Sequence, residues 1–290
     1  MRYYSYFPGC SSSDGGAKAY GQSSQVVAKA LDMDLIELEG WNCCGSTPYS
    51  SIDELASLST AARNLALAEK KGLNLVTPCS ACYVTLNRAN SCLKEYPQLK
   101  DDVDKALAAG GLEYHGTVRV RHLFEVMIKD IGYGEIESKV KKKLSELKVA
   151  PYYGCQIVRP DKGFDDPEFP QSLDQLTDCL GATVTIFPLK SRCCGGSLII
   201  PEEDVALGLI HKLLDSAVTG GAECIATVCP LCQTNLDVYQ RKVNKRFKTH
   251  YNIPVLFFTQ LVGLAMGMGS KELGIDKGIV SANKLLSRYL

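Results

Sequence analysis

Short apolar runs alternate with longer helical patterns along the first half of the chain. The runs end at glycine, proline or asparagine and are too short for helices, so they predict strands. The longer segments carry apolar residues at helical spacing, and the one that ends at Lys71 is rich in alanine, a strong helix former. A βαβαβα order follows, with strands at 3–7, 34–38 and 74–77 and helices around 22–31, over 51–71 and from 78 onward.

The second half repeats this order. Its expected strands are 152–155, 183–187 and 224–228, and its expected helices are 172–180 and 202–218. Similar segments, 122–127 and 257–262, end the two halves. We therefore expect an α/β fold of two pseudo-symmetric Rossmann-like βαβαβα modules, residues 1–134 and 149–290, joined by a charged linker helix at 135–148. The apolar region 256–268 and a terminal helix at 277–290 either pack in the second core or dock a partner.

One cysteine pattern occurs twice. In the first copy a single cysteine is followed after 32 residues by a vicinal pair and after 34 more by Cys-x-x-Cys. The corresponding intervals in the second copy are 37 and 34 residues, which indicates an internal duplication. Each cysteine group follows an expected strand, so the two sites should form outside the carboxyl ends of the strands. The ten cysteines are Cys10, Cys43, Cys44, Cys79 and Cys82, then Cys155, Cys193, Cys194, Cys229 and Cys232.

Charge and composition indicate the cell compartment of the protein and exclude some classes of partner. The formal net charge is zero, so no basic field would recruit nucleic acid or anionic lipid. The N-terminal residues lack the features of a signal peptide, and the longest apolar stretch, 253–268, is too short for a membrane span. We expect a cytoplasmic protein, where structural disulfides are rare, and thirteen cysteines then indicate metal binding.

Five thiols per half favour an iron–sulfur cluster over zinc. A structural zinc site closes with four ligands, and a fifth thiolate would add uncompensated negative charge. Two adjacent cysteines with diverging side chains are better suited to two irons than to one tetrahedral ion. Zinc in one half, with iron in the other, stays open as an alternative. The ordinary ferredoxin spacing is absent from the sequence.

The arrangement C-x(31–39)-CC-x(35–36)-C-x-x-C is the CCG motif, and two copies on a chain of this length resemble the B subunit of the heterodisulfide reductases of methanogenic archaea. The second spacer, 34 residues in both halves, is one residue short of that range. The resemblance covers nearly the whole chain. Lactate, glycolate, succinate and thiol:fumarate oxidoreductase systems share the motif, so an electron-transfer subunit of another CCG-type oxidoreductase is the alternative.

This resemblance implies two noncubane [4Fe–4S] clusters, one per cysteine quintet, and reductive cleavage of the coenzyme M–coenzyme B heterodisulfide to two thiols in methanogenesis. Cleavage of a disulfide bond needs two electrons and leaves two sulfurs. Two centres that face each other across a pseudo-two-fold axis could each supply one electron and bind one sulfur. No hydride-carrier motif is present, so electrons must come from a partner. The resemblance implies two partner subunits of heterodisulfide reductase, one ferredoxin-like and one flavin-containing, with a hydrogenase or formate dehydrogenase.

Other residues are candidates for binding the acidic groups of such a substrate. Cationic side chains near the cysteine loops are expected to contribute, and ordinary surface charge is the alternative for each of them.

His122 is a candidate proton relay, or else a core histidine. Cys92, Cys179 and Cys224 lie outside the repeat, and Cys179 and Cys224 are expected to act as small buried apolar residues. The cationic candidates are Lys18, Arg159, Lys162, Lys190 and Arg192.

Overall fold

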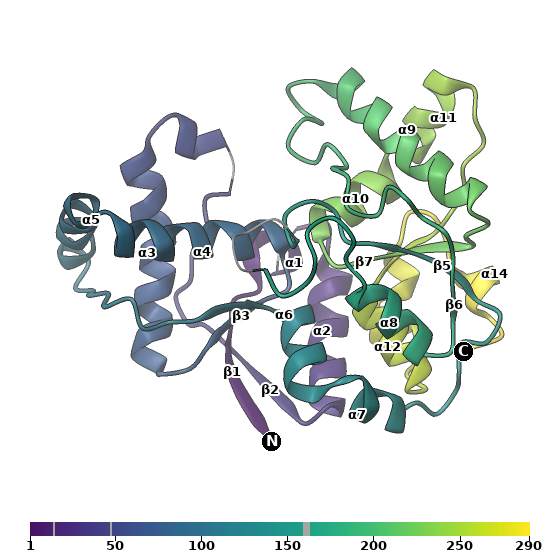
Figure 1. The fold of residues 1–290 in the computed structure, drawn as a ribbon, viewed down its shortest axis with the longest axis horizontal. Coiled ribbons are helices and arrows are strands. Elements are labelled where there is room, and N and C mark those ends of the chain that lie inside the picture. Colours follow the sequence, from purple (N-terminus) through teal and green to yellow (C-terminus); the bar gives the residue numbers. More distant parts are fainter. Residues whose placement is uncertain (14, 47, 159–162) are drawn as a thin grey trace.

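The computed structural model describes residues 1–13, 15–46, 48–158 and 163–290, which form two similar α/β halves (Figure 1). The first half contains a four-stranded parallel sheet in the order β2-β1-β3-β4. Its strands are β1 (Arg2–Tyr6), β2 (Met33–Glu37), β3 (Leu75–Thr77) and β4 (Val120–His122). Its helices are α1 (Gly9–Ser13), α2 (Lys18–Ala30), the 3₁₀-helix η1 (Pro48–Ser51), α3 (Glu54–Lys71), α4 (Ser80–Glu95), α5 (Pro97–Ala109), α6 (Leu123–Val126), the π-helix η2 (Met127–Ile131) and α7 (Tyr133–Ser138).

The second half has the same topology. Its parallel sheet has the order β6-β5-β7-β8, so each strand occupies the place of its counterpart in the first sheet. The strands are β5 (Lys148–Tyr152), β6 (Thr183–Val184), β7 (Cys224–Thr227) and β8 (Val255–Phe257). The helices are α8 (Ser172–Cys179), α9 (Glu203–Thr219), α10 (Pro230–Val238), α11 (Gln240–Phe247), α12 (Phe258–Ala265), α13 (Ser270–Leu273), the 3₁₀-helix η3 (Ile275–Lys277) and α14 (Asn283–Leu286). The expected α/β class and the two-module architecture are confirmed.

Helix α3 shows how local sequence fixes an element. The side chain of Asp53 accepts a hydrogen bond from the Ala56 N–H at 2.9 Å, which satisfies one of the free donors of the first turn. Gly72 ends the helix in the left-handed conformation at φ 65°. Small buried residues, among them Ala61, Ala62 and Ala66, let this helix lie close to its neighbours. The expected alanine-rich helix is confirmed, although it begins at Glu54 rather than at residue 51.

A hydrophobic core joins the two halves. Buried residues of α2 and α12 belong to one continuous cluster that includes side chains of both sheets. The rings of Phe124 and Phe258, at equivalent places in the two halves, meet edge to face at 5.0 Å. A hydrogen bond of 2.7 Å between the hydroxyls of Ser23 and Thr259 adds a buried polar contact between α2 and α12. Two further clusters fill the outer layers of the first and second halves.

The number of strands per sheet differs from the expectation. A fourth strand, β4 or β8, lies at one edge of each sheet, where the sequence predicted three strands per module. Both are only three residues long, and their register is set by pairing with β3 and β7 rather than by an extended apolar run of their own. Both continue directly into short helices, which explains why the segments 122–127 and 257–262 resemble each other.

The linker helix expected over 135–148 is present only as α7, which ends at Ser138. Beyond it, the N–H groups of Lys141 and Lys142 donate to the carbonyl of Ala265 at 2.9 and 3.0 Å, so this segment caps the end of α12 instead of continuing its own helix. The module boundaries at 134 and 149 stay a prediction.

The terminal helix expected over 277–290 is also wrong over most of its length, because only α14 forms. The Asp237 carboxylate accepts hydrogen bonds from the N–H groups of Ile279 and Val280 and holds the chain in a non-helical conformation there.

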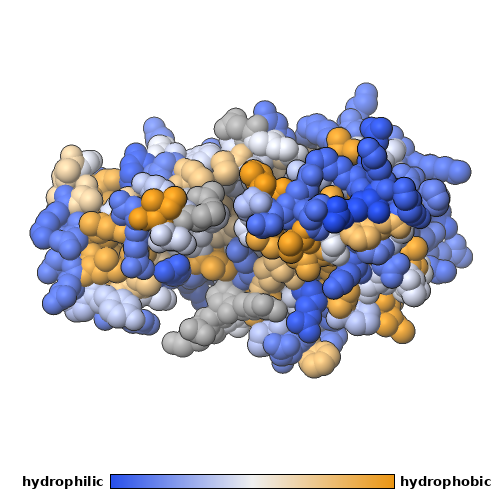
Figure 2. Space-filling view, turned by 90° about the horizontal axis from the view of Figure 1, so that it is seen from above, coloured by the Kyte–Doolittle hydropathy of each residue, from blue (hydrophilic) through white to orange (hydrophobic). Residues whose placement is uncertain are grey.

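Across the described ranges, none of the helices is both long and apolar enough to cross a membrane. On the face seen from above in Figure 2, hydrophobic residues form separate groups among hydrophilic ones. Two of the most exposed apolar side chains, Ile52 at 80% and Ile200 at 91%, follow the vicinal cysteines of the first and second halves.

Candidate metal centre

The cysteines of each quintet follow the strands of one parallel sheet. In the first half Cys10 follows β1, the vicinal pair follows β2, and Cys79 follows β3 as the N-cap of α4. Because the strands are parallel, their carboxyl ends lie at one edge of the sheet, and the three loops meet there. The second half places its cysteines in the same way after β5, β6 and β7, with Cys229 as the N-cap of α10.

In the first half the sulfur atoms lie in close pairs. The Sγ atoms of Cys44 and Cys82 are 3.3 Å apart, and those of Cys43 and Cys10 are 4.0 Å apart. Hydrogen bonds from the thiols of Cys43 and then Cys82 lower the pKa of Cys44, which favours the thiolate, the form that binds metal. Cys10 and Cys43 are exposed and the other three are buried, so the site has one open side.

The second half shows the same pairing. The Sγ atoms of Cys194 and Cys232 are 3.7 Å apart, and the side chain of Cys155 contacts that of Cys193. The N–H of Gly195 donates to the Sγ of Cys193 at 3.3 Å, the kind of backbone-to-sulfur hydrogen bond that tunes iron–sulfur centres. Cys193 is exposed, so this site also opens to one side.

The two quintets touch each other. The side chains of Cys79 and Cys229, each the first cysteine of a Cys-x-x-Cys pair, interact with each other across the boundary between the halves. This contact is the first cause that raises the pKa of Cys79 well above its ordinary value. Both side chains are buried, at 4% and 5% exposure, so the contact lies inside the molecule. The sequence predicted two sites but gave no distance between them.

At equivalent positions in the two halves, a glycine lets the backbone pass close to a cysteine sulfur. Gly9 and Gly154, each directly before the first cysteine of its quintet, both have φ 70°. A Cβ on Gly9 would lie 3.0 Å from the Sγ of Cys82, and one on Gly154 would lie 2.8 Å from the Sγ of Cys232. The contact at Gly154 is shorter than real Cβ atoms make and the one at Gly9 is unusually tight, so glycine at both positions, also favoured by the positive φ, lets the chain pass this close to the sulfurs.

The donor set of each half fits an iron–sulfur cluster. Five thiols per half, paired sulfur contacts, closely approaching backbone and an N–H aimed at sulfur are all features that such a cluster uses. Within the described ranges, no group of three or more His, Cys, Asp or Glu side chains is arranged around one metal ion. The cysteine assignments from the sequence therefore rest on the convergence of the loops and on the sulfur pairs.

His122 lies between the two Cys-x-x-Cys loops. Its Nδ1 accepts the Phe124 N–H at 3.1 Å as the N-cap of α6, and its ring hydrogen-bonds the backbone at Pro78 and Val228, the residues before Cys79 and Cys229. Burial lowers its pKa to about 4, so the ring is neutral at pH 7. At 0% exposure it braces both loops from inside. Its role as a proton relay stays a prediction.

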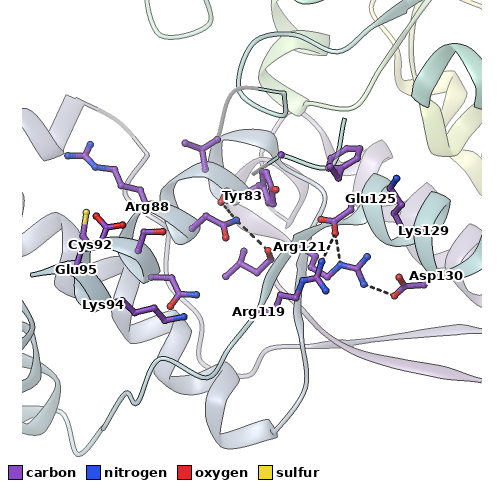
Figure 3. A pocket seen from close by; sticks show the side chains of 17 residues that line it. Tyr83, Arg88, Cys92, Lys94, Glu95, Arg119, Arg121, Glu125, Lys129 and Asp130 are labelled. Carbon is purple, nitrogen blue, oxygen red and sulfur yellow. Dashed lines mark hydrogen bonds and ion pairs between the residues drawn. The ribbon is translucent and has the colours of Figure 1, made fainter. Parts of the chain in front are cut away.

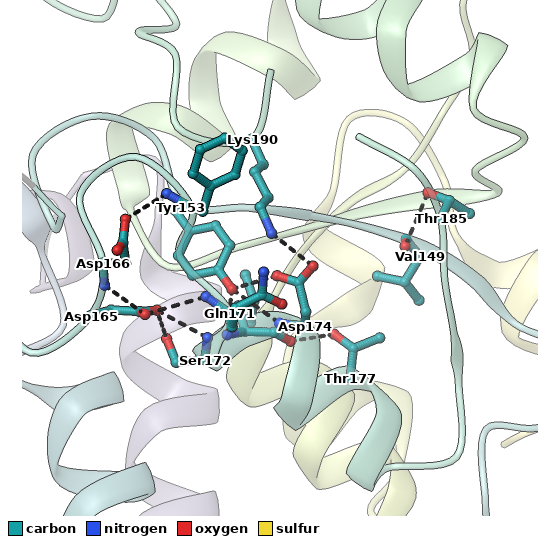
Figure 4. A network of polar contacts seen from close by, with 12 residues as sticks. Val149, Tyr153, Asp165, Asp166, Gln171, Ser172, Asp174, Thr177, Thr185 and Lys190 are labelled. Carbon is teal, nitrogen blue, oxygen red and sulfur yellow. Dashed lines mark hydrogen bonds and ion pairs between the residues drawn. The ribbon is translucent and has the colours of Figure 1, made fainter. Parts of the chain in front are cut away.

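The cationic candidates lie in different settings. Lys190 is engaged internally, because its Nζ pairs with Asp174 at 2.9 Å and lies 5.5 Å from the Tyr153 ring centroid (Figure 4). Arg192 is exposed beside Cys193, and its carbonyl accepts the Tyr152 hydroxyl at 2.7 Å. Lys18 is exposed at the start of α2. Arg159 and Lys162 lie outside the described residues.

The polar network in Figure 4 positions the second quintet. The Tyr153 hydroxyl contacts the Asp174 carboxylate and accepts the N–H groups of Leu173 and Asp174, which ties β5 to the start of α8. The carbonyl of Lys190 accepts the N–H groups of Tyr153 and Gly154 at 2.9 and 3.2 Å, directly before Cys155. Lys190 thus holds the Cys155 loop in place, a role that the sequence did not indicate.

Of the cysteines outside the repeat, Cys224 is buried as expected, whereas Cys179 is only partly buried. Cys224 is buried in β7, and burial raises its pKa to about 12. Cys179 is half-buried, with its Sγ 3.3 Å from the carbonyl of Tyr133. Cys92 is also half-buried, on α4.

Fold and site define a two-module, cysteine-rich α/β protein with a thiol-rich centre at the strand ends of each module. The profile of the CCG cysteine-rich domain matches residues 4–87 and 149–237, more than half of the chain. The chain belongs to the CCG cysteine-rich domain family.

Relatives with named activities are subunits of redox complexes. The chain is 40% identical over 287 residues to the 8-methylmenaquinol:fumarate reductase membrane anchor subunit of Wolinella succinogenes, covering 98% of this chain and 99% of that one. It is 33% identical over 272 residues to the B subunit of the ferredoxin/F420H2-dependent CoB-CoM heterodisulfide reductase of Methanosarcina acetivorans, covering 92% and 90%. The similarity supports a CCG-type, iron–sulfur oxidoreductase subunit.

The fold is also found in a solved structure. A hypothetical protein from Helicobacter pylori superimposes with a TM-score of 0.76 at 18% identity. The match covers 97% of this chain and 52% of that chain, and it supports the fold alone.

Proposed function

We propose that this chain is the catalytic subunit of a disulfide reductase of the heterodisulfide type, with a noncubane [4Fe–4S] cluster on each cysteine quintet. The contact between Cys79 and Cys229 supports this proposal, because it brings the two cysteine quintets next to each other inside the protein. A disulfide has two sulfurs and needs two electrons, so two adjacent centres match the bond to be broken. The proposed substrate is the heterodisulfide of coenzyme M and coenzyme B.

The reaction balances with an external electron donor. One disulfide, two electrons and two protons give two thiols, and the S–S bond is the only bond that breaks. Iron–sulfur clusters supply one-electron transfer and iron positions that accept thiolates. The chain's own residues would hold the centres: ten cysteines as ligands, Gly9 and Gly154 as close-approach backbone, and His122 and Lys190 as braces of the ligand loops.

The electrons are proposed to come from partner subunits in the cytoplasm. The similarity to B subunits of heterodisulfide reductases supports partner subunits of that complex, and we propose that one of them is ferredoxin-like. The other would contain a flavin and receive electrons from a hydrogenase or formate dehydrogenase.

The test uses anoxically purified protein. Adding coenzyme M to the oxidised form should change its electron paramagnetic resonance spectrum, because the thiol binds at the centre. The matched control is 2-hydroxyethanesulfonate, which has the sulfonate but no thiol and should leave the spectrum unchanged. With reduced viologen as donor, each heterodisulfide consumed should release two thiols. An unchanged spectrum together with no thiol release would refute the proposal.

A second function is favoured by the higher identity to the fumarate reductase relative. In this alternative the chain passes electrons between a quinol and a flavin-containing fumarate reductase, and its centres bind no thiol. Coenzyme M would then leave the spectrum unchanged, while a menaquinol analogue would reduce the centres. The two functions therefore give opposite results in the same sample.

A further inference from the structure

A wide cavity lies along helix α4, the helix that begins at the Cys-x-x-Cys turn of the first quintet (Figure 3). It encloses about 970 Å³, which is enough for a coenzyme-sized molecule. Helix α4 forms one wall, and β4 with the π-helix η2 forms the other. Tyr83, the residue directly after Cys82, is part of the wall and lies between the two sides in the close-up view. The wall of the cavity thus starts one residue after the candidate ligand Cys82.

The floor of this cavity is a closed and neutral ion-pair network. Buried Arg121 donates to Glu125 at 2.8 Å and to Asp130 at 2.6 Å, and the Tyr4 hydroxyl donates to Asp130 at 2.7 Å. Arg119 lies 3.3 Å from the same Glu125 carboxylate. Two guanidinium groups balance two carboxylates, so the floor is rigid and adds no net charge.

The rim, in contrast, has surplus positive charge. Its remaining charged residues are Arg88, Lys94 and Lys129 against the single carboxylate of Glu95, and all four are exposed. Among the described residues, neither lysine has an ion-pair partner. Arg88 pairs at 3.3 Å with Glu54, which lies outside this cavity. Although the whole chain is neutral, this rim would attract an anion.

A second, smaller cavity adjoins the rim on the side of the ligand loops. It encloses about 200 Å³ and shares Val84 and Arg88 with the first cavity, so the two adjoin. Its walls include Gly45, the residue after Cys44, and Gln156, the residue after Cys155. Its wall thus includes a sequence neighbour of each quintet, whereas none of the quintet cysteines is part of the wall itself. Its only charged wall residues in the described chain are Glu54 and Arg88, whose ion pair is exposed to solvent, so Arg88 can exchange Glu54 for an anion in the outer cavity.

We propose that the outer cavity binds the acidic end of a thiol or disulfide substrate, a carboxylate, sulfonate or phosphate, through Arg88, Lys94 and Lys129. The inner cavity then takes the uncharged sulfur-bearing part toward the cysteine quintets. This proposal deepens the proposed function and rests on it for the identity of the reacting group. It makes the three cations specificity-determining residues that do not touch the reacting sulfurs.

A binding experiment tests this assignment without turnover. The probe is 3,3′-thiodipropionate, a dianionic thioether that cannot be reduced, and the matched neutral probe is 2,2′-thiodiethanol. Calorimetric titration of the anoxic holoprotein should show binding of the dianion that weakens with added salt, and no comparable binding of the diol. Lys94→Gln and Lys129→Gln should each raise the Kd about fivefold, and Arg88→Gln about tenfold.

Arg241→Gln, on exposed α11 of the other half, is the control and should leave the Kd unchanged. Iron content measured for every variant verifies that the centres are intact. Equal binding of dianion and diol, or lysine variants that bind like Arg241→Gln, would overturn the inference. If the dianion binds as expected but coenzyme M and heterodisulfide give no response, the proposed function fails and the anion site stands. If heterodisulfide is reduced with unchanged KM in all three variants, the function stands and the anion site fails.

Discussion

Replacing Gly154 with alanine should remove the metal centre of the second half. Gly154 has φ 70°, and an alanine Cβ at this position would lie 2.8 Å from the Sγ of Cys232. The left-handed backbone alone costs an alanine about 1–2 kcal/mol. The contact is a larger problem, because carbon and sulfur need a separation of roughly 3.5 Å or more.

The sulfur would therefore have to move by about 0.7 Å, whereas metal–ligand distances tolerate only about 0.2 Å. Cys232 is buried at 6% exposure, so the surrounding core leaves it little room to move. We expect the anoxically purified Gly154→Ala protein to contain about half of the wild-type iron and acid-labile sulfide, because only the centre of the first half would form.

Gly221→Ala is the matched control. Gly221 has φ 79°, but a Cβ there would meet no atom within 4 Å, so this variant has the same backbone strain without the sulfur contact. Both variants should lose about 1–2 kcal/mol of unfolding free energy in urea from strain, and only Gly154→Ala should lose iron. Equal iron content in the two variants would refute the argument that backbone approach at Gly154 shapes the site.

The remaining predictions concern buried groups. His122→Gln should remove a pH dependence of the unfolding free energy. The pKa of His122 is about 4 in the folded protein against 6.5 in the unfolded chain, so the neutral ring stabilises the wild type fully above pH 6.5. As the pH falls from 6.5 toward 4, this contribution decreases by about 3 kcal/mol. Urea unfolding at pH 7.5 and 5.5 should show a smaller difference in the variant than in the wild type, and equal differences would contradict this account. Glu125→Gln should lower the free energy of unfolding in urea by about 2–4 kcal/mol, because it weakens the buried ion pairs of Arg121. The control Glu113→Gln changes a side chain that is 82% exposed and should leave the free energy of unfolding unchanged. Cys79→Ala should lose iron, while Cys224→Ala, which replaces a buried thiol outside the quintets, should keep the full wild-type content; iron loss in both would mean that the quintet assignment is wrong.

Much of the fold and of the ligand set follows from sequence. The duplicated spacing and the placement of cysteines directly after strands predict two equivalent sites, and the Cys-x-x-Cys turns do open helices as N-caps at Cys79 and Cys229. These features are local: they depend on the period of apolar residues, on glycine, and on the end of a strand. The structure places the quintets at the expected edge of each sheet.

What the sequence misses depends on contacts between distant residues. Strands β4 and β8 are too short to stand out and exist through pairing with β3 and β7. The segment after α7 looks helical by its charged composition, but its N–H groups bind Ala265, more than a hundred residues away. Likewise, the cationic rim brings Arg88 of α4 and Lys129 of η2 to one cavity, and nothing in their sequence spacing indicates this. Lys190 is one of the candidate cations in the sequence, and its pairing with Asp174 is a contact that its position in the sequence does not indicate.

The core shared by α2 and α12 has a consequence for electron transfer. Because interdigitated side chains such as Phe124 and Phe258 pack the halves together, we expect the spacing between the two quintets to stay nearly constant. Tunnelling rates fall steeply with separation, so under the proposed function a fixed spacing would keep the electronic coupling between the two centres constant. Reactants would then reach the quintets through their exposed sides, at Cys10, Cys43 and Cys193.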